Sequence, residues 1–327
     1  MPSRRVDGAR ALAAEPATTL VAIGNFDGVH RGHRAVIRAG VERAAERGLS
    51  PLVLTFHPHP SEVLGRGRRA PMLTAIDRKV ELITRIDPAL RVVVEPFTLE
   101  LSKETPRQFV EQLLVGQLGA RVVLVGDNFR FGHDRAGDLA TLVELGQEFG
   151  FEAGAEPLIG DGGGAYSSTR VRQLVAAGDV RGAAMVLGRP HSLAGLVVEG
   201  DQRGRTIGVP TANLDAVREA LPPNGVYACV VDRLEEQGAT ALGAGVTNIG
   251  RRPTVDGTRL SIEAHLLDFD ADLYGARLRV HLIERLRDEL RFSGLDELKA
   301  QIARDIAAAR PILERTSPDP EALGAWY

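Results

Sequence analysis

Cysteine and lysine are both scarce in this 327-residue chain. The single cysteine, Cys229, cannot form an internal disulfide, which suits a reducing compartment. The only lysines are Lys79, Lys103 and Lys299, and none of them follows a glycine. That excludes a phosphate-binding loop of the G-x-x-x-x-G-K-[ST] kind. Any phosphate must therefore be handled by backbone amides, arginine and metal.

Long apolar runs and a strong charge excess are also missing. No apolar stretch approaches the roughly 18 residues of a membrane helix, and residues 1–16 lack the apolar centre of a signal peptide. The formal net charge is −3 and aromatic residues make up 5% of the chain, which argues against a nucleic-acid binder. We therefore expect a soluble, cytoplasmic protein with neither nucleic-acid nor membrane partners.

Continuous apolar runs recur through the first half of the chain, with helix-like segments between them. Such runs are typical of parallel strands that helices cover on both faces. Thr74 with Asp77 fits a capping box, and Thr105 with Pro106 fits an N-cap and first helical residue. We expect a parallel α/β domain with strands at Thr19–Ile23, Pro51–Phe56, Arg91–Phe97 and Arg121–Gly126, and a further helix at Asp138–Phe149.

The texture of the sequence changes after Pro190. A flexible GDGGG stretch (residues 160–164) and a helical pair ending near Gly188 come first. Strand-like segments with turns between them then follow, which favours an antiparallel barrel or sandwich. We place two domains at residues 1–188 and 189–327. The second has strands at His191–Glu199, Gly225–Asp232, Ala239–Asn248, Arg259–Asp268 and Ala276–Arg285, a helix from Leu295 to about Ala309, and a short C-terminal helix.

A glycine- and histidine-rich turn, GNFDGVHRGH (residues 24–33), follows the first strand. Ligands of open parallel sheets bind at such strand ends, and the next helix offers unpaired N–H groups to a phosphate. His30 and His33 are three residues apart, so they share one face of the first helical turn. They could stabilise charge on the phosphates of a nucleotide under attack. The alternative is a glycine-rich connection with two solvated histidines.

Three further polar segments lie at element ends. TFHPHP (residues 55–60) ends the second strand, and its histidines could suggest a zinc site. No carboxylate or cysteine completes a set of zinc ligands, however, so we favour a place for this segment at the rim of a nucleotide pocket. GDNFRFG (126–132) ends the fourth strand, with Phe129 and Phe131 as possible core residues. YSSTRVR (166–172) opens a helix with more hydroxyls than a cap needs, which suits a triphosphate.

In the second half, GLVVEGDQRGRTIGVPTANL (residues 195–214) has glycines at turns where backbone can wrap phosphates. Thr211 and Asn213 are two residues apart, so they share one side of an extended strand, and their oxygens suit Mg²⁺. Without further context, a bare T-x-N is better read as a turn or a strand edge. Periodicity alone makes Glu263 an ordinary solvated residue opposite an apolar strand face.

Together these segments resemble the bacterial bifunctional riboflavin kinase/FMN adenylyltransferase (FAD synthetase) family. The resemblance covers, in order, G-N-F-D-G-V-H-R-G-H, T-F-H-P-H-P, L-T-x-x-D-R-K (Leu73–Lys79), G-D-N-F-R-F-G and S-S-T-R-V-R. It implies a Rossmann-like nucleotidyltransferase domain in which His30 and His33 contact ATP phosphates during adenylyl transfer. The implied ATP site comprises Gly24, Phe26, Asp27, His30, His33, Asn128, Ser167, Ser168, Thr169 and Arg170.

The resemblance continues through the second domain, where G-R-x-x-G-x-P-T-A-N and E-x-H-L-L-D match the riboflavin kinase part. It implies a small antiparallel barrel with a C-terminal helix, and Glu263 as the base that takes the proton from the riboflavin 5′-hydroxyl. Thr211 and Asn213 would hold Mg²⁺. The segment Leu286–Leu298 also resembles the family's R-x-E-x-x-F-x-x-L-D-x-L pattern, except that Gly294 stands where that pattern more usually has serine. The implied ATP and flavin site comprises Gly200, Gly204, Arg205, Gly208, Pro210, Thr211, Asn213 and Arg252.

The expected ligands are thus riboflavin, FMN, FAD, ATP and Mg²⁺, with homo-oligomer formation possible. Two rival functions remain open at this point. One is a nucleotidyltransferase for another phosphorylated substrate, with the barrel used only for binding. The other is an RNA-binding protein, which the acidic balance and the lack of a basic stripe disfavour. A single retained activity is a third possibility, although no motif looks broken.

Overall fold

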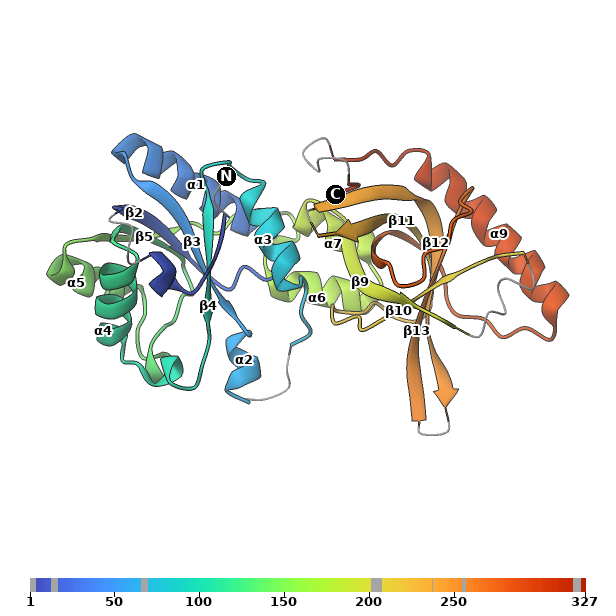
Figure 1. Cartoon of the computed structure of the whole chain (residues 1–327), viewed down its shortest axis with the longest axis horizontal. Coiled ribbons are helices and arrows are strands. Elements are labelled where there is room, and N and C mark those ends of the chain that lie inside the picture. The colour runs from blue at the N-terminus through green and yellow to red at the C-terminus, as the bar shows by residue number, and fades with distance from the viewer. Residues whose placement is uncertain are drawn as a thin grey trace. The chain divides into compact units, whose positions relative to one another are not determined.

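The computed structural model describes residues 4–12, 17–65, 70–200, 208–236, 238–254, 257–319 and 325–327; the side chains of 251–254 and 257–259 are also outside this description. The chain forms two compact units, which are drawn in Figure 1. One consists of Met1–Ala70 with Thr74–Ser167, and the other of Pro71–Leu73 with Ser168–Tyr327. The expected boundary near residue 188 stays a prediction.

The first unit contains a six-stranded, wholly parallel sheet in the order β1-β4-β3-β2-β5-β6. From the central strand β2 the chain passes to β3 on one side and reaches β5 on the other. In open parallel sheets such a reversal leaves a crevice at the carboxyl ends of the strands. The strands are β1 (Arg5–Asp7), β2 (Thr19–Ile23), β3 (Ser50–His57), β4 (Arg91–Pro96), β5 (Ala120–Gly126) and β6 (Glu152–Glu156).

Helices cover both faces of this sheet, which confirms the predicted α/β architecture. Ile37 of α1 (Arg31–Arg47) packs with Ile83 of α3 (Ile76–Thr84) in one apolar cluster. Leu114 of the π-helix η3 (Phe109–Gln117) packs with Leu142 of α5 (Leu139–Phe149) in another. The shorter elements are η1 (Ala9–Leu12), α2 (Pro60–Val63), η2 (Leu101–Lys103), α4 (Pro106–Gln108), η4 (His133–Arg135), β7 (Gly160–Asp161) and β8 (Gly164–Ala165).

One predicted helix start is confirmed and one is wrong. Thr105 caps α4 as expected, because its hydroxyl accepts from the Gln108 N–H while the Gln108 side chain accepts from the Thr105 N–H. The capping box at Thr74 does not form, since α3 begins at Ile76 without a side-chain cap. The backbone N–H of Thr74 instead donates to Asp27 Oδ1 at 3.1 Å, in the turn after β2.

The second unit contains a closed barrel in the order β10-β13-β12-β11-β14-β9, with every neighbour antiparallel. Closure removes the unpaired edges that an open sheet would expose. Tyr227 and Cys229 of β11 point into the barrel core, whereas Val226 and Ala228 face the opposite cluster with α9 (Leu295–Leu313). The strands are β9 (His191–Val198), β10 (Ala212–Asp215), β11 (Gly225–Glu235), β12 (Gly238–Thr254), β13 (Gly257–Leu266) and β14 (Arg277–Arg287).

Two helices precede the barrel and confirm the predicted helical pair. They are α6 (Ser168–Ala177) and α7 (Val180–Leu187), and α7 ends at Gly188 in a left-handed conformation (φ 76°). Val180 packs into the barrel core, so these helices belong to the second unit. The short C-terminal helix expected after α9 is absent from the described residues 314–319 and 325–327. None of the helices in the described ranges has the length and hydrophobicity of a membrane span.

Candidate functional sites

The turn between β2 and α1 brings two histidine rings into contact. His30 is the N-cap of α1, and its Nδ1 accepts a hydrogen bond from the backbone N–H of His33 at 3.3 Å. Because Nδ1 accepts, the ring hydrogen of a neutral His30 resides on Nε2. The rings of His30 and His33 stack with centroids 3.5 Å apart and planes 23° apart. The pair therefore lies at the positive N-terminal end of a 17-residue helix, as the sequence predicted.

Tight packing fixes the position of this histidine pair. Phe26 lies edge-on to His33, with ring centroids 5.2 Å apart. A Cβ on Gly24 would come within 3.0 Å of the Phe26 ring. A Cβ on Gly32 would come within 3.1 Å of both the His30 ring and the Tyr166 carbonyl oxygen. Glycine at both positions thus allows this close approach, and neither glycine has a left-handed φ.

Two further predicted segments follow β3 and β5, the two strands that neighbour β2. Asn128, after β5, is exposed, while Phe131 is buried and stacks on Phe129 at 5.4 Å. The possible core role of these aromatics is therefore confirmed. His59, after β3, caps α2 by accepting from the Ser61 N–H at 3.2 Å.

The serine-rich loop is divided between the two units. Ser167 ends the first unit, whereas Ser168, Thr169 and Arg170 begin α6 in the second. The predicted helix start is confirmed at Ser168. A role for these three residues at the nucleotide site remains a prediction.

Sequence reasoning assigned no chemical role to Lys79, a residue that contacts the turn. Lys79 on α3 is 6% exposed, and its Nζ donates to the Asn25 carbonyl oxygen at 2.7 Å. Burial lowers the pKa of Lys79, and the nearby Asp27 charge opposes that shift. Since Lys79 and Asn25 are 54 residues apart, no local spacing could have revealed this contact.

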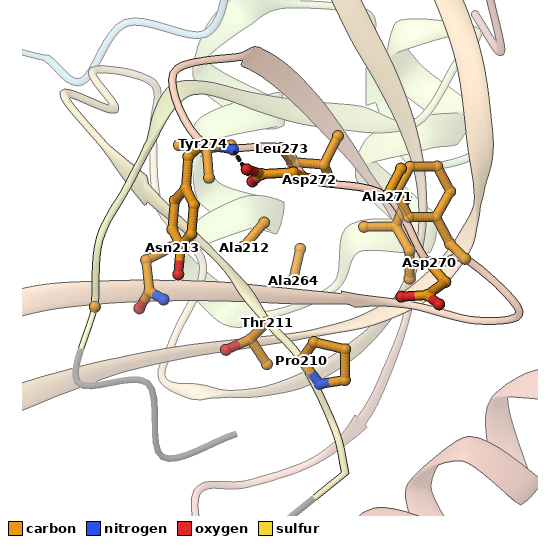
Figure 2. A pocket seen from close by; sticks show the side chains of 14 residues that line it. Pro210, Thr211, Ala212, Asn213, Ala264, Asp270, Ala271, Asp272, Leu273 and Tyr274 are labelled. Atoms are coloured by element: carbon orange, nitrogen blue, oxygen red, sulfur yellow. Dashed lines mark hydrogen bonds between the residues drawn. The ribbon is translucent and has the colours of Figure 1, made fainter. Parts of the chain in front are cut away.

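The barrel unit holds a cavity of about 290 Å³ beside β10 and the loop between β13 and β14. Figure 2 shows Thr211, Asn213, Asp270 and Tyr274 around it. Asp272 Oδ1 accepts from the Tyr274 N–H at 3.0 Å, which holds part of this loop in shape. Of the predicted kinase residues, the structure brings Gly200, Pro210, Thr211 and Asn213 together in the cavity lining.

Glu263 stands beside this cavity rather than in its lining. Its neighbours Ile262 and Ala264 are buried, and Glu263 lies on the opposite face of β13, as its periodicity predicted. Its side chain is half-buried there rather than fully solvated. Its Oε1 accepts a hydrogen bond from Ser261 Oγ at 2.7 Å. In the strand register, Glu263 is opposite Asn213 of β10 on one side and opposite Asn248 of β12 on the other. The three polar residues therefore form a row across adjacent strands.

Some predicted residues are not in the cavity lining or cannot be placed. Gly208 is exposed, with a left-handed φ of 79°. Gly204 and Arg205 lie outside the described residues, as does the side chain of Arg252. Their proposed contacts with ATP or flavin stay predictions.

Comparison with known proteins finds a different family model in each half of the chain. Residues 12–170 match the family model of FAD synthetase, and residues 187–313 match that of riboflavin kinase. Two relatives described as bifunctional riboflavin kinase/FMN adenylyltransferase come from Escherichia coli (strain K12) and Pseudomonas fluorescens. The first is 42% identical over 91% of this chain and 94% of the relative. The second is 40% identical over 94% of this chain and 97% of the relative.

A more distant relative and a solved structure extend the comparison. The Bacillus subtilis (strain 168) protein of the same description is 36% identical over 90% of this chain and 92% of its own. A crystal structure described as a macrolide-efflux protein from Streptococcus pneumoniae has a TM-score of 0.80 and 27% identity, covering 94% of this chain and 99% of that one. None of these relatives is described as an RNA-binding protein or as a transferase for another phosphorylated substrate, so neither alternative gains support.

Proposed function

The chain belongs to the family of bifunctional riboflavin kinases/FMN adenylyltransferases, and from that premise we propose that each unit catalyses one step. The barrel unit phosphorylates riboflavin with ATP to give FMN and ADP. The parallel-sheet unit then adenylylates FMN with a second ATP to give FAD and diphosphate. The stacked pair His30–His33 at the start of α1 is the observation that carries the second assignment.

In adenylyl transfer, a phosphate oxygen of FMN bonds to the α-phosphorus of ATP, and the bond from that phosphorus to the bridging oxygen breaks. Negative charge grows on the oxygens around the α-phosphorus and on the departing diphosphate. His30 Nε2–H, the His33 ring and the N-terminal amides of α1 are fixed donors for this charge. Asn128 and Ser167, which belong to the same unit, supply further ATP contacts in this proposal.

In the kinase step, the riboflavin 5′-hydroxyl oxygen bonds to the γ-phosphorus and ADP leaves. Such a transfer needs mostly positioning, charge neutralisation and an oriented nucleophile. Glu263 is the group proposed to accept the hydroxyl proton. Its support is its place opposite Asn213, a residue of the cavity lining, and its hydrogen bond from Ser261, which orients the carboxylate.

The donor set of the barrel cavity fits a magnesium ion. Thr211 and Asn213 offer a hydroxyl and an amide oxygen, and Asp270 and Asp272 add carboxylates to the same lining. Oxygen donors are the ligands that Mg²⁺ prefers, and it commonly shares the phosphates of a nucleotide. Bound by Thr211 and Asn213, the ion would neutralise charge on the transferred phosphoryl group. A group of three or more His, Cys, Asp or Glu side chains suited to a metal is absent among the described residues.

The direct test is incubation of the purified chain with riboflavin and Mg-ATP, with FMN and FAD separated by chromatography over time. FMN should appear first and FAD after a lag, because FMN is the substrate of the second step. FMN without FAD, or no product from riboflavin, would contradict the two-step assignment. Chelation of Mg²⁺ should stop FMN formation.

A further inference from the structure

The turn that presents the histidine pair has a backbone that needs external support. Phe26 and Val29 adopt left-handed φ values of 46° and 41°, and Gly28 lies between them at 88°. Left-handed backbone is uncommon for any residue with a side chain and is a genuine outlier for β-branched valine. Such residues persist only where the surrounding structure over-determines their conformation. The contacts that hold this turn are therefore part of the site.

Two motifs outside the turn supply those contacts. The Asn25 carbonyl oxygen accepts from Lys79 Nζ at 2.7 Å and from Thr55 Oγ1 at 3.2 Å, which uses both of its lone pairs. Asp27 Oδ1 accepts from the Thr74 N–H at 3.1 Å. Phe26 thus lies between Asn25 and Asp27, each of which is held by hydrogen bonds from outside the turn. Thr74 and Lys79 both come from the L-T-x-x-D-R-K segment, to which no role was assigned above.

Lys79 is an unusual residue for such a task. Lysines are almost never fully buried without a partner, yet Lys79 is 6% exposed, and Asp27 at 5% exposure provides the opposing charge. Val80 and Ile83, on the same helix, pack in one cluster with Phe26 and Val29. Helix α3 therefore contacts the turn in two ways, through apolar packing and through the hydrogen bond from the Lys79 ammonium group.

We propose that Lys79 is a positioning residue for adenylyl transfer, which holds the Asn25 carbonyl so that the turn aims the histidine pair. The physical path is short: Asn25 adjoins Phe26, the Phe26 ring lies edge-on to His33 at 5.2 Å, and His33 stacks on His30 at 3.5 Å. Releasing the carbonyl lets Phe26 relax and moves the imidazoles. The inference rests on the proposed role of this histidine pair.

The test compares Lys79→Met with Lys103→Met, a matched change at an exposed lysine of the same unit. FAD formation from added FMN and ATP is measured together with FMN formation from riboflavin in the same preparations. Because misplacement by about 1 Å can cost about 10²-fold in rate, Lys79→Met should lower the kcat of FAD formation by about that factor. KM for ATP should change by less than about threefold, since an interaction effective only in the transition state lowers kcat alone. Lys103→Met should match the wild type in both steps.

Two more measurements separate positioning from folding. The Hε1 proton resonances of His30 and His33 should shift in Lys79→Met and stay in place in Lys103→Met. Thr55→Val, which removes the second donor to the Asn25 carbonyl, should lower the same kcat by a smaller factor without loss of FMN formation. An unchanged kcat in Lys79→Met overturns the proposal. A parallel loss of both activities in Lys79→Met and Thr55→Val also overturns it and assigns these residues to stability. If His30→Ala with His33→Ala keeps full FAD formation, the role of the histidine pair fails, whatever the Lys79 result. If the wild type forms no FAD from FMN and ATP, the proposed function itself fails.

Discussion

Asn213 on β10 and Glu263 on β13 pair directly across two antiparallel strands. Side chains opposite each other in such a pair have Cβ atoms about 4.5–5.5 Å apart. Asn213 belongs to the cavity lining and Glu263 does not. The carboxylate thus stands one strand away from the residue proposed to bind metal. A base in that place could reach a hydroxyl group at the cavity edge without being a metal ligand itself.

Glu263→Gln tests this arrangement while keeping the size of the side chain. Removal of a general base usually costs about 10²–10⁴-fold in rate, so FMN formation should fall by that amount. FAD formation from added FMN should be unchanged, because Glu263 lies in the barrel unit. Both products are measured by chromatography. Ser261→Ala, which removes the hydrogen bond to Glu263, should have a smaller effect of the same kind. Loss of both activities in a folded variant would contradict the two-site model.

His30→Ala combined with His33→Ala should have the opposite pattern. Loss of fixed donors to developing charge costs about 10²–10³-fold for each donor, so FAD formation should become undetectable or nearly so. FMN formation from riboflavin should persist. His133→Ala, at an exposed histidine of the same unit, serves as the control and should retain both steps. FAD formation at the wild-type rate would remove the histidine pair from the mechanism.

Much of the architecture was predictable because its strands carry strong local patterns. All five residues of β2 are buried, and its continuous apolar run predicted a strand covered on both faces. Strands β1 and β6 were missed. Val6 is the only apolar residue of β1, and β6 reads EAGAE, so each is a strand because its neighbour offers hydrogen bonds. Edge strands of this kind depend on tertiary context that local sequence does not contain.

The candidate sites show the same division between local and distant information. The spacing of His30 and His33 predicted a shared helical face, and the structure places their rings in contact. The partners of the turn, Thr74 and Lys79, are 47 and 54 residues away from the residues they contact. Thr74 was assigned to a helix cap because that is its commonest local use. Its backbone N–H instead donates to Asp27 Oδ1. Whether Thr74 caps the helix or contacts this turn depends on the tertiary structure.

A buried pair in the barrel unit predicts how stability depends on pH. Asp232 Oδ2 and His281 Nε2 are 2.8 Å apart, and both side chains are completely buried. Burial alone would raise the pKa of Asp232, but the hydrogen bond and charge of His281, the Trp326 N–H and Arg279 outweigh it and lower that pKa. The pKa of Asp232 is therefore lower in the folded chain than in the unfolded chain, where it is 3.8. The ionised carboxylate stabilises the fold fully above the unfolded pKa, and this stability is lost as the pH falls through the folded pKa.

Asp232→Asn should therefore lower the free energy of unfolding by about 3–5 kcal/mol at pH 7, the usual cost of breaking a buried pair. The difference from the wild type should shrink below about pH 4, because Asp232 of the unfolded wild-type chain then begins to bind a proton while the folded carboxylate, with its lower pKa, does not. Urea denaturation at both pH values measures this. Asp288→Asn, at a carboxylate 79% exposed and paired with Arg285, should cost less than about 1 kcal/mol. An equal Asp232→Asn difference at pH 7 and pH 3 would contradict the assigned pKa direction.

Gly32→Ala separates the geometry of the histidine pair from the stability of its helix. The added Cβ would lie 3.1 Å from both the His30 ring and the Tyr166 carbonyl oxygen, so at least one of them must move. Alanine favours a helix over glycine by up to about 1 kcal/mol, so the first unit should remain folded. FAD formation should nevertheless fall by at least about tenfold, because small displacements of positioned groups are costly, while FMN formation persists. Gly294→Ala, whose Cβ would meet nothing within 4 Å, should leave both rates unchanged. If Gly32→Ala also left FAD formation unchanged, close packing against His30 would not be required for adenylyl transfer.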